Sequence, residues 1–264
     1  TPSATRTATA TPAPTAAAPA RPHVFVIVME NTALEVALRQ PYTARLAARY
    51  ALATNYHAVG SPSLPNYLAM TSGSTWGIED NDYHPLPATG IGAQLNAAGI
   101  PWRAYMEGLT SQGCLDSPDP YALKHNPFAY YGGACPANVV PLTALAADLA
   151  SGAQGFTWIT PDLCNDGHDC GPATADTWLA TTVPQIVGSP SWRDGVLFIV
   201  WDEAGAGGSQ RIPLIVVSDS LLAQTTAVAH DHYSLLATIE DLLGLPRLGA
   251  AAGARPLSEL LRTP

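Results

Sequence analysis

Short apolar, β-branched runs that alternate with helical segments constrain the fold of this chain more than any other feature. The runs that indicate buried strands are His23–Met29, Trp102–Met106, Phe156–Thr160, Val196–Trp201 and Pro213–Val217. Helices are expected near Thr43–Leu52, Pro65–Thr71, Leu142–Ala150, Ala173–Ile186 and Tyr233–Leu243, with a loop between Leu52 and Ser63. Strands that alternate with helices predict an α/β domain with a mainly parallel sheet.

Polar side chains follow two of these strands directly. Glu30 and Asn31 come after the first strand, and Asp202 and Glu203 come after Trp201. Ligands bind beyond the carboxyl ends of parallel strands, so we expect these side chains to lie close together. Converging carboxylates repel one another unless a cation lies between them, and this all-oxygen set suits Ca²⁺, Mg²⁺ or Mn²⁺. The alternative is that these residues cap the turns that follow the strands.

The segment SPSLPNYLAMTSGS places a hydroxyl just before a predicted helix. Ser63 precedes Pro65, which is expected in the first helical turn. Free backbone N–H groups and the positive end of the helix dipole suit a hydroxyl that accepts a phosphoryl group. A helix N-cap is the alternative role for the same serine.

The four cysteines lie in loops. Cys114 and Cys135 flank a segment rich in Gly, Pro and Tyr, while Cys164 and Cys170 bracket Asn-Asp-Gly-His-Asp. An even number of loop cysteines favours two disulfides in an exported protein, and pairing 114 with 135 and 164 with 170 closes the shortest loops. The alternative is a zinc site made by Cys164, His168 and Cys170.

Composition limits the possible partners. The 264 residues carry a net charge of −9 and include only 12 basic residues, which argues against nucleic-acid binding. No apolar stretch reaches the roughly 20 residues that a membrane-spanning helix needs. Residues 1–22 are rich in Thr, Ala and Pro and are expected to be a disordered tail, and residues 23–264 are expected to form one domain.

Six segments, in this order, resemble a known family. They are HVFVIVMEN, NYHAVGSPSLPNYLAMTSG, KHNPFAYY, FTWITPDLCNDGHDC, GVLFIVWDE and HYSLLATIEDLLG. Together they resemble the bacterial phosphoesterase family of acid phosphatases and phospholipases C, within the alkaline-phosphatase superfamily. The compact length and the NDxHD segment are similar to small secreted acid phosphatases of the phosphatidylinositol-3-phosphatase type. The resemblance implies an alkaline-phosphatase-like three-layer sandwich around the predicted sheet.

The resemblance also implies a metal site and a nucleophile. Glu30, Asn31, Asp202 and Glu203 match the metal ligands of the family, and Ser63 matches the nucleophile, which also contacts the metal. One divalent ion is expected, with Ca²⁺ favoured over Mg²⁺ and Mn²⁺. Contact with the ion lowers the pKa of the serine hydroxyl.

Further residues match the phosphate-binding and leaving-group positions of the family. Asp166 and His168 match an Asp-His region, where the histidine binds phosphate or protonates the leaving group. Asn81 in GIEDN matches an asparagine that bonds a phosphate oxygen, with Asp80 as its neighbour. His125 and His232 match recurring histidines and are predicted to line the substrate site, whereas His57 is expected to pack in the protein.

We therefore predict a secreted or cell-envelope phosphomonoesterase that forms a phosphoseryl intermediate at Ser63. Its substrates are predicted to be phosphoinositides or other small phosphomonoesters. One alternative is a phospholipase C-like phosphodiesterase at the same site, although the short glycine-rich segment after Glu203 lacks the Asp-His pair of larger phospholipases. The sequence also allows a non-catalytic calcium-binding surface domain and a serine hydrolase, and the hydrolase is disfavoured because no Gly-x-Ser-x-Gly surrounds Ser63.

Overall fold

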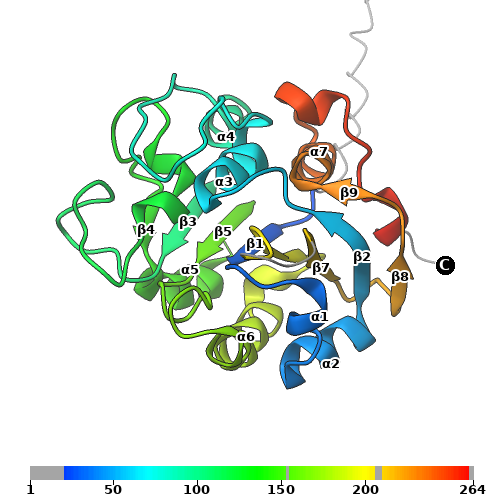
Figure 1. The fold of residues 1–264 in the computed structure, drawn as a ribbon. Coiled ribbons are helices and arrows are strands. Elements are labelled where there is room, and N and C mark those ends of the chain that lie inside the picture. Colours follow the sequence, from blue (N-terminus) through cyan, green and yellow to red (C-terminus); the bar gives the residue numbers. More distant parts are fainter. Residues whose placement is uncertain (1–20, 153–154, 206–209, 262–264) are drawn as a thin grey trace, which may run out of the picture.

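A nine-stranded sheet forms the centre of the protein, as Figure 1 shows. The structure is a computed structural model and describes residues 21–152, 155–205 and 210–261. The strand order is β4-β3-β5-β1-β6-β7-β2-β8, and β9 pairs with β2. Almost all of the predicted tail at residues 1–22 lies outside the described residues, so that prediction stays open.

The central strands are the apolar runs that the sequence indicates. They are β1 (Val24–Met29), β3 (Trp102–Met106), β5 (Phe156–Thr160) and β6 (Val196–Trp201). All four are parallel: β1 pairs with β5 and with β6, and β3 pairs with β5. Every residue of β1, β5 and β6 is buried, which explains why β1 and β6 are continuously apolar and why only two threonines, Thr157 and Thr160, interrupt the apolar residues of β5. The predicted mainly parallel α/β sheet is confirmed.

One half of the sheet departs from the sequence-based expectation. Ala51–His57 forms β2, where a helix end and a loop were expected, and the preceding helix stops at Arg49. β2 pairs antiparallel with β7 (Arg211–Val217), which is also antiparallel to β6. The segment Ala51–His57 has no long apolar run, so its pairing with β7 and not its own periodicity decides its structure. Three short strands are also present: β4 (Val139–Pro141), β8 (Gln224–Thr226) and β9 (His230–Asp231).

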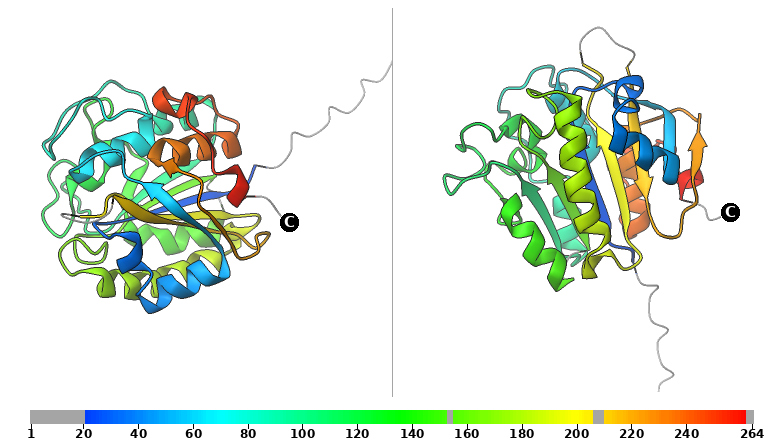
Figure 2. Two further views of the ribbon diagram at one scale, coloured as in Figure 1. Left: turned by 45° about the vertical axis from the view of Figure 1, so that its right-hand side comes forward. Right: turned by 90° about the horizontal axis from the view of Figure 1, so that it is seen from below.

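Helices cover both faces of the sheet and give three layers. On one face lie α3 (Ser63–Ser72), α4 (Ile91–Ala97) and α7 (His232–Leu243). On the other face lie α1 (Leu34–Ala37), α2 (Pro41–Arg49), α5 (Leu145–Ser151) and α6 (Pro172–Val187), and Figure 2 shows α6 running along the strands. The predicted helix at 142–150 is divided into a short 3-10 turn, Leu142–Ala144, followed by α5.

Two disulfides join the four cysteines, Cys114 to Cys135 and Cys164 to Cys170. This is the pairing that closes the shortest loops, and it excludes the zinc alternative because both thiols of that set are in a disulfide. The second disulfide closes the loop that carries Asp166 and His168. None of the described helices combines the length and the apolar character that crossing a membrane requires.

Candidate active site

The carboxyl ends of β1 and β6 bring the two polar pairs together. The parallel register sets Met29 opposite Trp201, so the residues that follow the two strands are neighbours. The backbone N–H of Asn31 donates to Oδ1 of Asp202 at 3.1 Å. Asn31 has a φ of 45°, a left-handed conformation that asparagine tolerates better than most residues, and this turns the chain immediately after the strand.

Two oxygens at this junction have no hydrogen-bond partner among the described residues. They are Oδ1 of Asn31 and Oδ2 of Asp202, and both are buried. Burial and the nearby charge of Glu30 hold the pKa of Asp202 well above its ordinary value. Because buried polar atoms are normally paired and buried like charges repel, this donor set fits a bound cation.

Ser63 is the first residue of α3 and faces Glu30. Its Oγ is buried and donates to Oε2 of Glu30 at 3.0 Å. One turn later on the same helix, the hydroxyl of Tyr67 donates to Oε1 of Glu30 at 2.6 Å. Burial and the charge of Glu30 raise the pKa of Tyr67, so the phenol keeps the proton that it donates. Tyr67 was not predicted, although its spacing of four residues from Ser63 places both on one face of the helix.

Asn81 is held at the beginning of the same helix. Its Oδ1 accepts the backbone N–H of Leu64 at 3.1 Å, which fixes the orientation of the side-chain amide. Asp80, the neighbour considered in its place, is exposed and pairs with His84 at 2.6 Å. The structure therefore places Asn81, and not Asp80, next to Ser63.

A buried histidine lies between two carboxylates. Nε2 of His125 is 3.3 Å from Oε2 of Glu30, and Nδ1 is 3.1 Å from Oδ2 of Asp166. Burial alone would lower the pKa of His125, but the charges and hydrogen bonds of the two carboxylates raise it to about 9. His125 therefore carries a positive charge, which in turn holds the pKa of Glu30 below its ordinary value against the effect of burial.

Glu30, His125 and Asp166 also form a group in which the atoms that could bind a metal ion all lie within 4.8 Å of one another. The two ring nitrogens of His125 face carboxylates on opposite sides of the ring, which is the arrangement of an ion-paired imidazolium. A metal ligand would need one of those nitrogens deprotonated. The ring nitrogens of His125 and Oδ2 of Asp166 also lack a well-aligned hydrogen bond, but the oxygens of Asn31 and Asp202 can bind a hard cation without deprotonation of a ring nitrogen.

The predicted Asp166–His168 pair is arranged differently from the expectation. Oδ1 of Asp166 accepts the backbone N–H of His168 at 2.7 Å, and its other oxygen faces His125. The ring of His168 interacts instead with Asp169, where Nδ1 is 2.6 Å from Oδ1. Its Nε2 is 2.9 Å from Nζ of Lys124. Neither Asp169 nor Lys124 was predicted as a site residue, although each is next to a predicted histidine in the sequence. Asp169 follows His168, and Lys124 precedes His125.

His232 contacts protein atoms through both ring nitrogens. Nε2 is 2.7 Å from the carbonyl oxygen of Asp202, and Nδ1 is 3.0 Å from the hydroxyl of Tyr56. Burial lowers the pKa of His232 to about 4, so the ring is neutral, donates to the carbonyl and accepts from the phenol. In place of the expected substrate contact, His232 supports the backbone that carries Asp202.

Glu203 and Asp162 both follow strands, but their contacts differ: Glu203 contacts a side chain near α3, whereas Asp162 binds backbone N–H groups of its own turn. Glu203 is partly buried, which raises its pKa, and it hydrogen-bonds to the side chain of Ser61 on the approach to α3. Oδ1 of Asp162 accepts the backbone N–H groups of Cys164 and Asn165 at 3.1 and 2.9 Å. Asp162 is therefore a turn cap.

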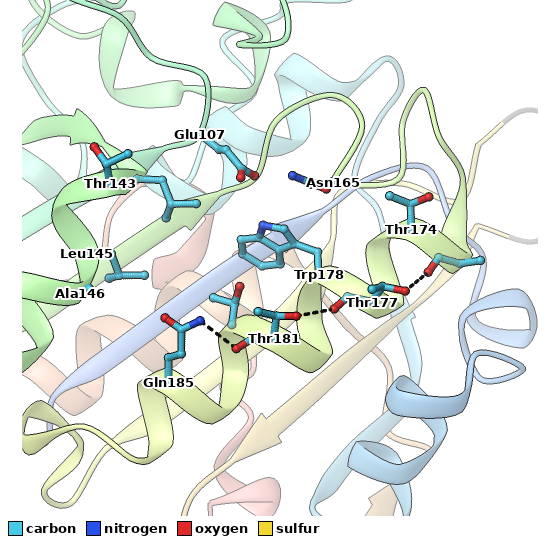
Figure 3. A pocket seen from close by; sticks show the side chains of 13 residues that line it. Glu107, Thr143, Leu145, Ala146, Asn165, Thr174, Thr177, Trp178, Thr181 and Gln185 are labelled. Carbon is cyan, nitrogen blue, oxygen red and sulfur yellow. Dashed lines mark hydrogen bonds between the residues drawn. The ribbon is translucent and has the colours of Figure 1, made fainter.

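A groove of about 790 Å³ lies between α5 and α6 (Figure 3). Glu107 and Asn165 lie at one end of it, and Trp178 lies between them and Gln185. Asn165 precedes Asp166 in the chain, but none of the described lining residues is a predicted site residue. Oε2 of Glu107 accepts the backbone N–H of Asp162 at 3.1 Å, so this carboxylate supports the loop between β5 and α6.

Comparison with known proteins identifies the family of the chain. The three-layer fold is similar to that of a protein in the alkaline phosphatase superfamily from Vibrio parahaemolyticus, which superposes with a TM-score of 0.65 at 13% identity, over 89% of this chain and 69% of that one. The model of the Phosphoesterase family matches residues 37–246. The chain belongs to the Phosphoesterase family and is a hydrolase of phosphoric ester bonds.

Two relatives have named activities. The phosphatidylinositol-3-phosphatase of Mycobacterium tuberculosis is 28% identical over 254 residues, which cover 92% of this chain and 84% of that protein. The phosphate-repressible acid phosphatase of Penicillium chrysogenum is 28% identical over 246 residues, which cover 84% of this chain and 59% of that protein. The chain therefore spans little more than half the length of the fungal relative.

Proposed function

We propose that this chain is a metal-dependent phosphomonoesterase of the acid phosphatase type, with Ser63 as the nucleophile. The observation that carries the proposal is the position of the Ser63 hydroxyl, 3.0 Å from Glu30 at the N-terminus of α3. The proposed substrates are small phosphomonoesters, including phosphoinositides, since the M. tuberculosis relative is named for one. The two disulfides fit an exported enzyme.

We propose that one divalent ion is held by Glu30, Asn31, Ser63, Asp202 and Glu203. The two unpartnered buried oxygens support this set, and its hard oxygen donors suit Ca²⁺ first, then Mg²⁺ or Mn²⁺. When bound, such an ion offsets the charge of the phosphoryl group and favours the serine alkoxide.

The side chains then have separate tasks. The hydroxyl of Ser63 loses its proton to water and its Oγ attacks phosphorus, while the bond from phosphorus to the leaving alkoxide breaks and that alkoxide takes a proton from water. Water then hydrolyses the phosphoseryl intermediate. The amide of Asn81 and the N-terminus of α3 stabilise the equatorial oxygens, where charge is high in the transition state. Tyr67 and His125 keep Glu30 ionised and oriented. Asp166 holds His125 in place, and His232 supports the backbone of Asp202.

The test compares p-nitrophenyl phosphate with bis(p-nitrophenyl) phosphate and a phosphocholine analogue, before and after chelation of divalent ions. We expect faster turnover of the monoester, loss of activity on chelation and recovery with one of the three ions. Ser63→Ala should lose roughly 10³-fold or more in kcat, while Ser258→Ala, at an exposed serine that begins a 3-10 turn, should not. Faster diester turnover would favour the phospholipase C-like alternative. Metal binding without any turnover would favour the calcium-binding alternative.

A further inference from the structure

Lys124 is the only lysine in the chain, and it lies beside the proposed active site. The other basic residues are eleven arginines, so this acidic protein has a single primary amine on a side chain. Lys124 belongs to the 3-10 turn Leu123–His125, and the next residue, His125, is the buried partner of Glu30. The position of Lys124 is thus fixed by the same turn that orders the site.

The hydrogen bonds around Lys124 have a defined direction. An ammonium group has three donors and no acceptor, so Nε2 of His168, at 2.9 Å from Nζ, must accept. Nδ1 then carries the ring proton and donates to Oδ1 of Asp169 at 2.6 Å. Asp169, His168 and Lys124 form a chain that orients the ammonium. In this arrangement Nε2 of His168 has no proton to give to a leaving group.

The charge of Lys124 is not balanced by a direct ion pair. Among the residues that the structure describes, no carboxylate oxygen lies within 4.0 Å of Nζ. The ring of His168 is 5.7 Å from that of His125, so the chain borders the buried site. A partly exposed ammonium in this position is available to an anion.

We propose that Lys124 is a substrate-binding residue whose ammonium contacts a non-bridging phosphoryl oxygen, and that His168 and Asp169 are its positioning residues. The inference rests on the proposed function, because the phosphoryl group must lie at Ser63. Lys124 acts through the charge and the hydrogen bonds of its ammonium group. It takes over the phosphate contact that the sequence assigned to His168.

The first test is kinetic. A hydrogen bond to a charged group contributes about 1.5–3 kcal/mol, so Lys124→Met should lower kcat/KM by about 10- to 150-fold. The inhibition constant of inorganic phosphate should rise in parallel, and Lys124→Arg should recover part of both. The loss should be equal for good and poor leaving groups, because the contact is to a non-bridging oxygen. A loss confined to poor leaving groups, or an unchanged phosphate inhibition constant, overturns the proposal.

Positioning is tested by a double-mutant cycle. His168→Ala should reproduce part of the Lys124→Met effect, and the double variant should resemble Lys124→Met alone. Fully additive losses would show that His168 acts independently of Lys124. The control Arg193→Met removes one exposed positive charge just before β6, at the opposite end of that strand from Asp202, and should leave the kinetics unchanged.

The second test uses the unique amine. N-acetylation removes the charge of Lys124, and reductive dimethylation keeps it, and peptide mapping separates this lysine from the α-amino group. We expect acetylation to inactivate the metal-loaded enzyme, dimethylation to be tolerated better, and inorganic phosphate to slow both modifications at Lys124. Equal modification with and without phosphate contradicts the inference. Wild-type kinetics in Lys124→Met together with inactive Ser63→Ala would reject the inference and leave the proposed function standing.

Discussion

The hydroxyl of Ser63 donates to Oε2 of Glu30 at 3.0 Å, although 33 residues separate the two in sequence. Glu30 follows the central strand β1, and Ser63 begins a helix that packs on one face of the sheet. The contact joins a carboxylate that is held by the sheet to a hydroxyl that is held by a helix. Residues on a strand end and a helix can be positioned more precisely than residues on loops, which suits the proposed nucleophile and the proposed metal ligand.

Replacing Asp202 with Asn should weaken metal binding by more than about tenfold, because one of its buried oxygens has no other partner. The measurement is the rise in Tm of the chelated protein on titration with Ca²⁺, Mg²⁺ or Mn²⁺. Asp194→Asn makes the same chemical change at the amino end of β6 and should titrate like the wild type. An unchanged titration in Asp202→Asn would place the ion elsewhere.

Tyr67→Phe should destabilise the protein by about 1–3 kcal/mol and lower kcat, because Oε1 of buried Glu30 loses its 2.6 Å hydrogen bond. Urea unfolding and steady-state kinetics measure the two effects. Tyr83→Phe removes a weaker bond of 3.4 Å from an exposed ring and serves as the control. If Tyr67→Phe has wild-type kinetics, the hydrogen bond from Tyr67 to Glu30 does not contribute to activity.

We expect removal of one disulfide to lower mainly the stability of the protein and removal of the other to lower mainly its activity. Loss of a disulfide that closes a short loop lowers the free energy of unfolding by about 2–3 kcal/mol, because the unfolded chain gains conformational entropy. Loss of a disulfide that closes a longer loop lowers it by more. Replacing Cys114 and Cys135 with serine should therefore lower the free energy of unfolding further, since 21 residues separate them against six for the other pair. Replacing Cys164 and Cys170 should lower kcat/KM further, because that loop carries Asp166. Equal kinetic losses in the two variants would contradict this assignment.

The ionisation of Glu240 should be visible in the pH dependence of the free energy of unfolding. Burial raises the pKa of this carboxyl from 4.5 to about 7, so between these values the unfolded chain ionises while the folded chain stays protonated. The unfolded state then binds fewer protons than the folded state, and stability falls as pH rises through that window. Glu240→Gln keeps the acceptor for the N–H of Leu248 and should be more stable than the wild type at pH 8 but not at pH 4.5.

Urea unfolding at intervals from pH 4.5 to pH 8 measures this difference. Glu79→Gln, at an exposed glutamate, should leave the pH dependence of the free energy of unfolding unchanged. If Glu240→Gln and the wild type show the same pH dependence, the carboxyl does not stay protonated in the folded state.

The sequence by itself determined the strands β1, β3, β5 and β6, because strands in the middle of a parallel sheet are largely buried and form short, mostly apolar runs. It also determined that Glu30 and Asp202 meet, since the ends of neighbouring parallel strands share one edge of the sheet. The cysteine pairing followed from loop length.

Only the tertiary structure decided what depends on pairing between distant segments. β2 forms because β7 pairs with it, and no local pattern in Ala51–His57 indicates that partner. The sequence predicted His125, Asp166 and His168 for the same site, but their contacts differ: His125 pairs with Asp166, and His168 contacts Lys124. The partner of a hydrogen-bonding group depends on which atoms the fold brings within about 3 Å, and residue spacing along the chain does not contain that information.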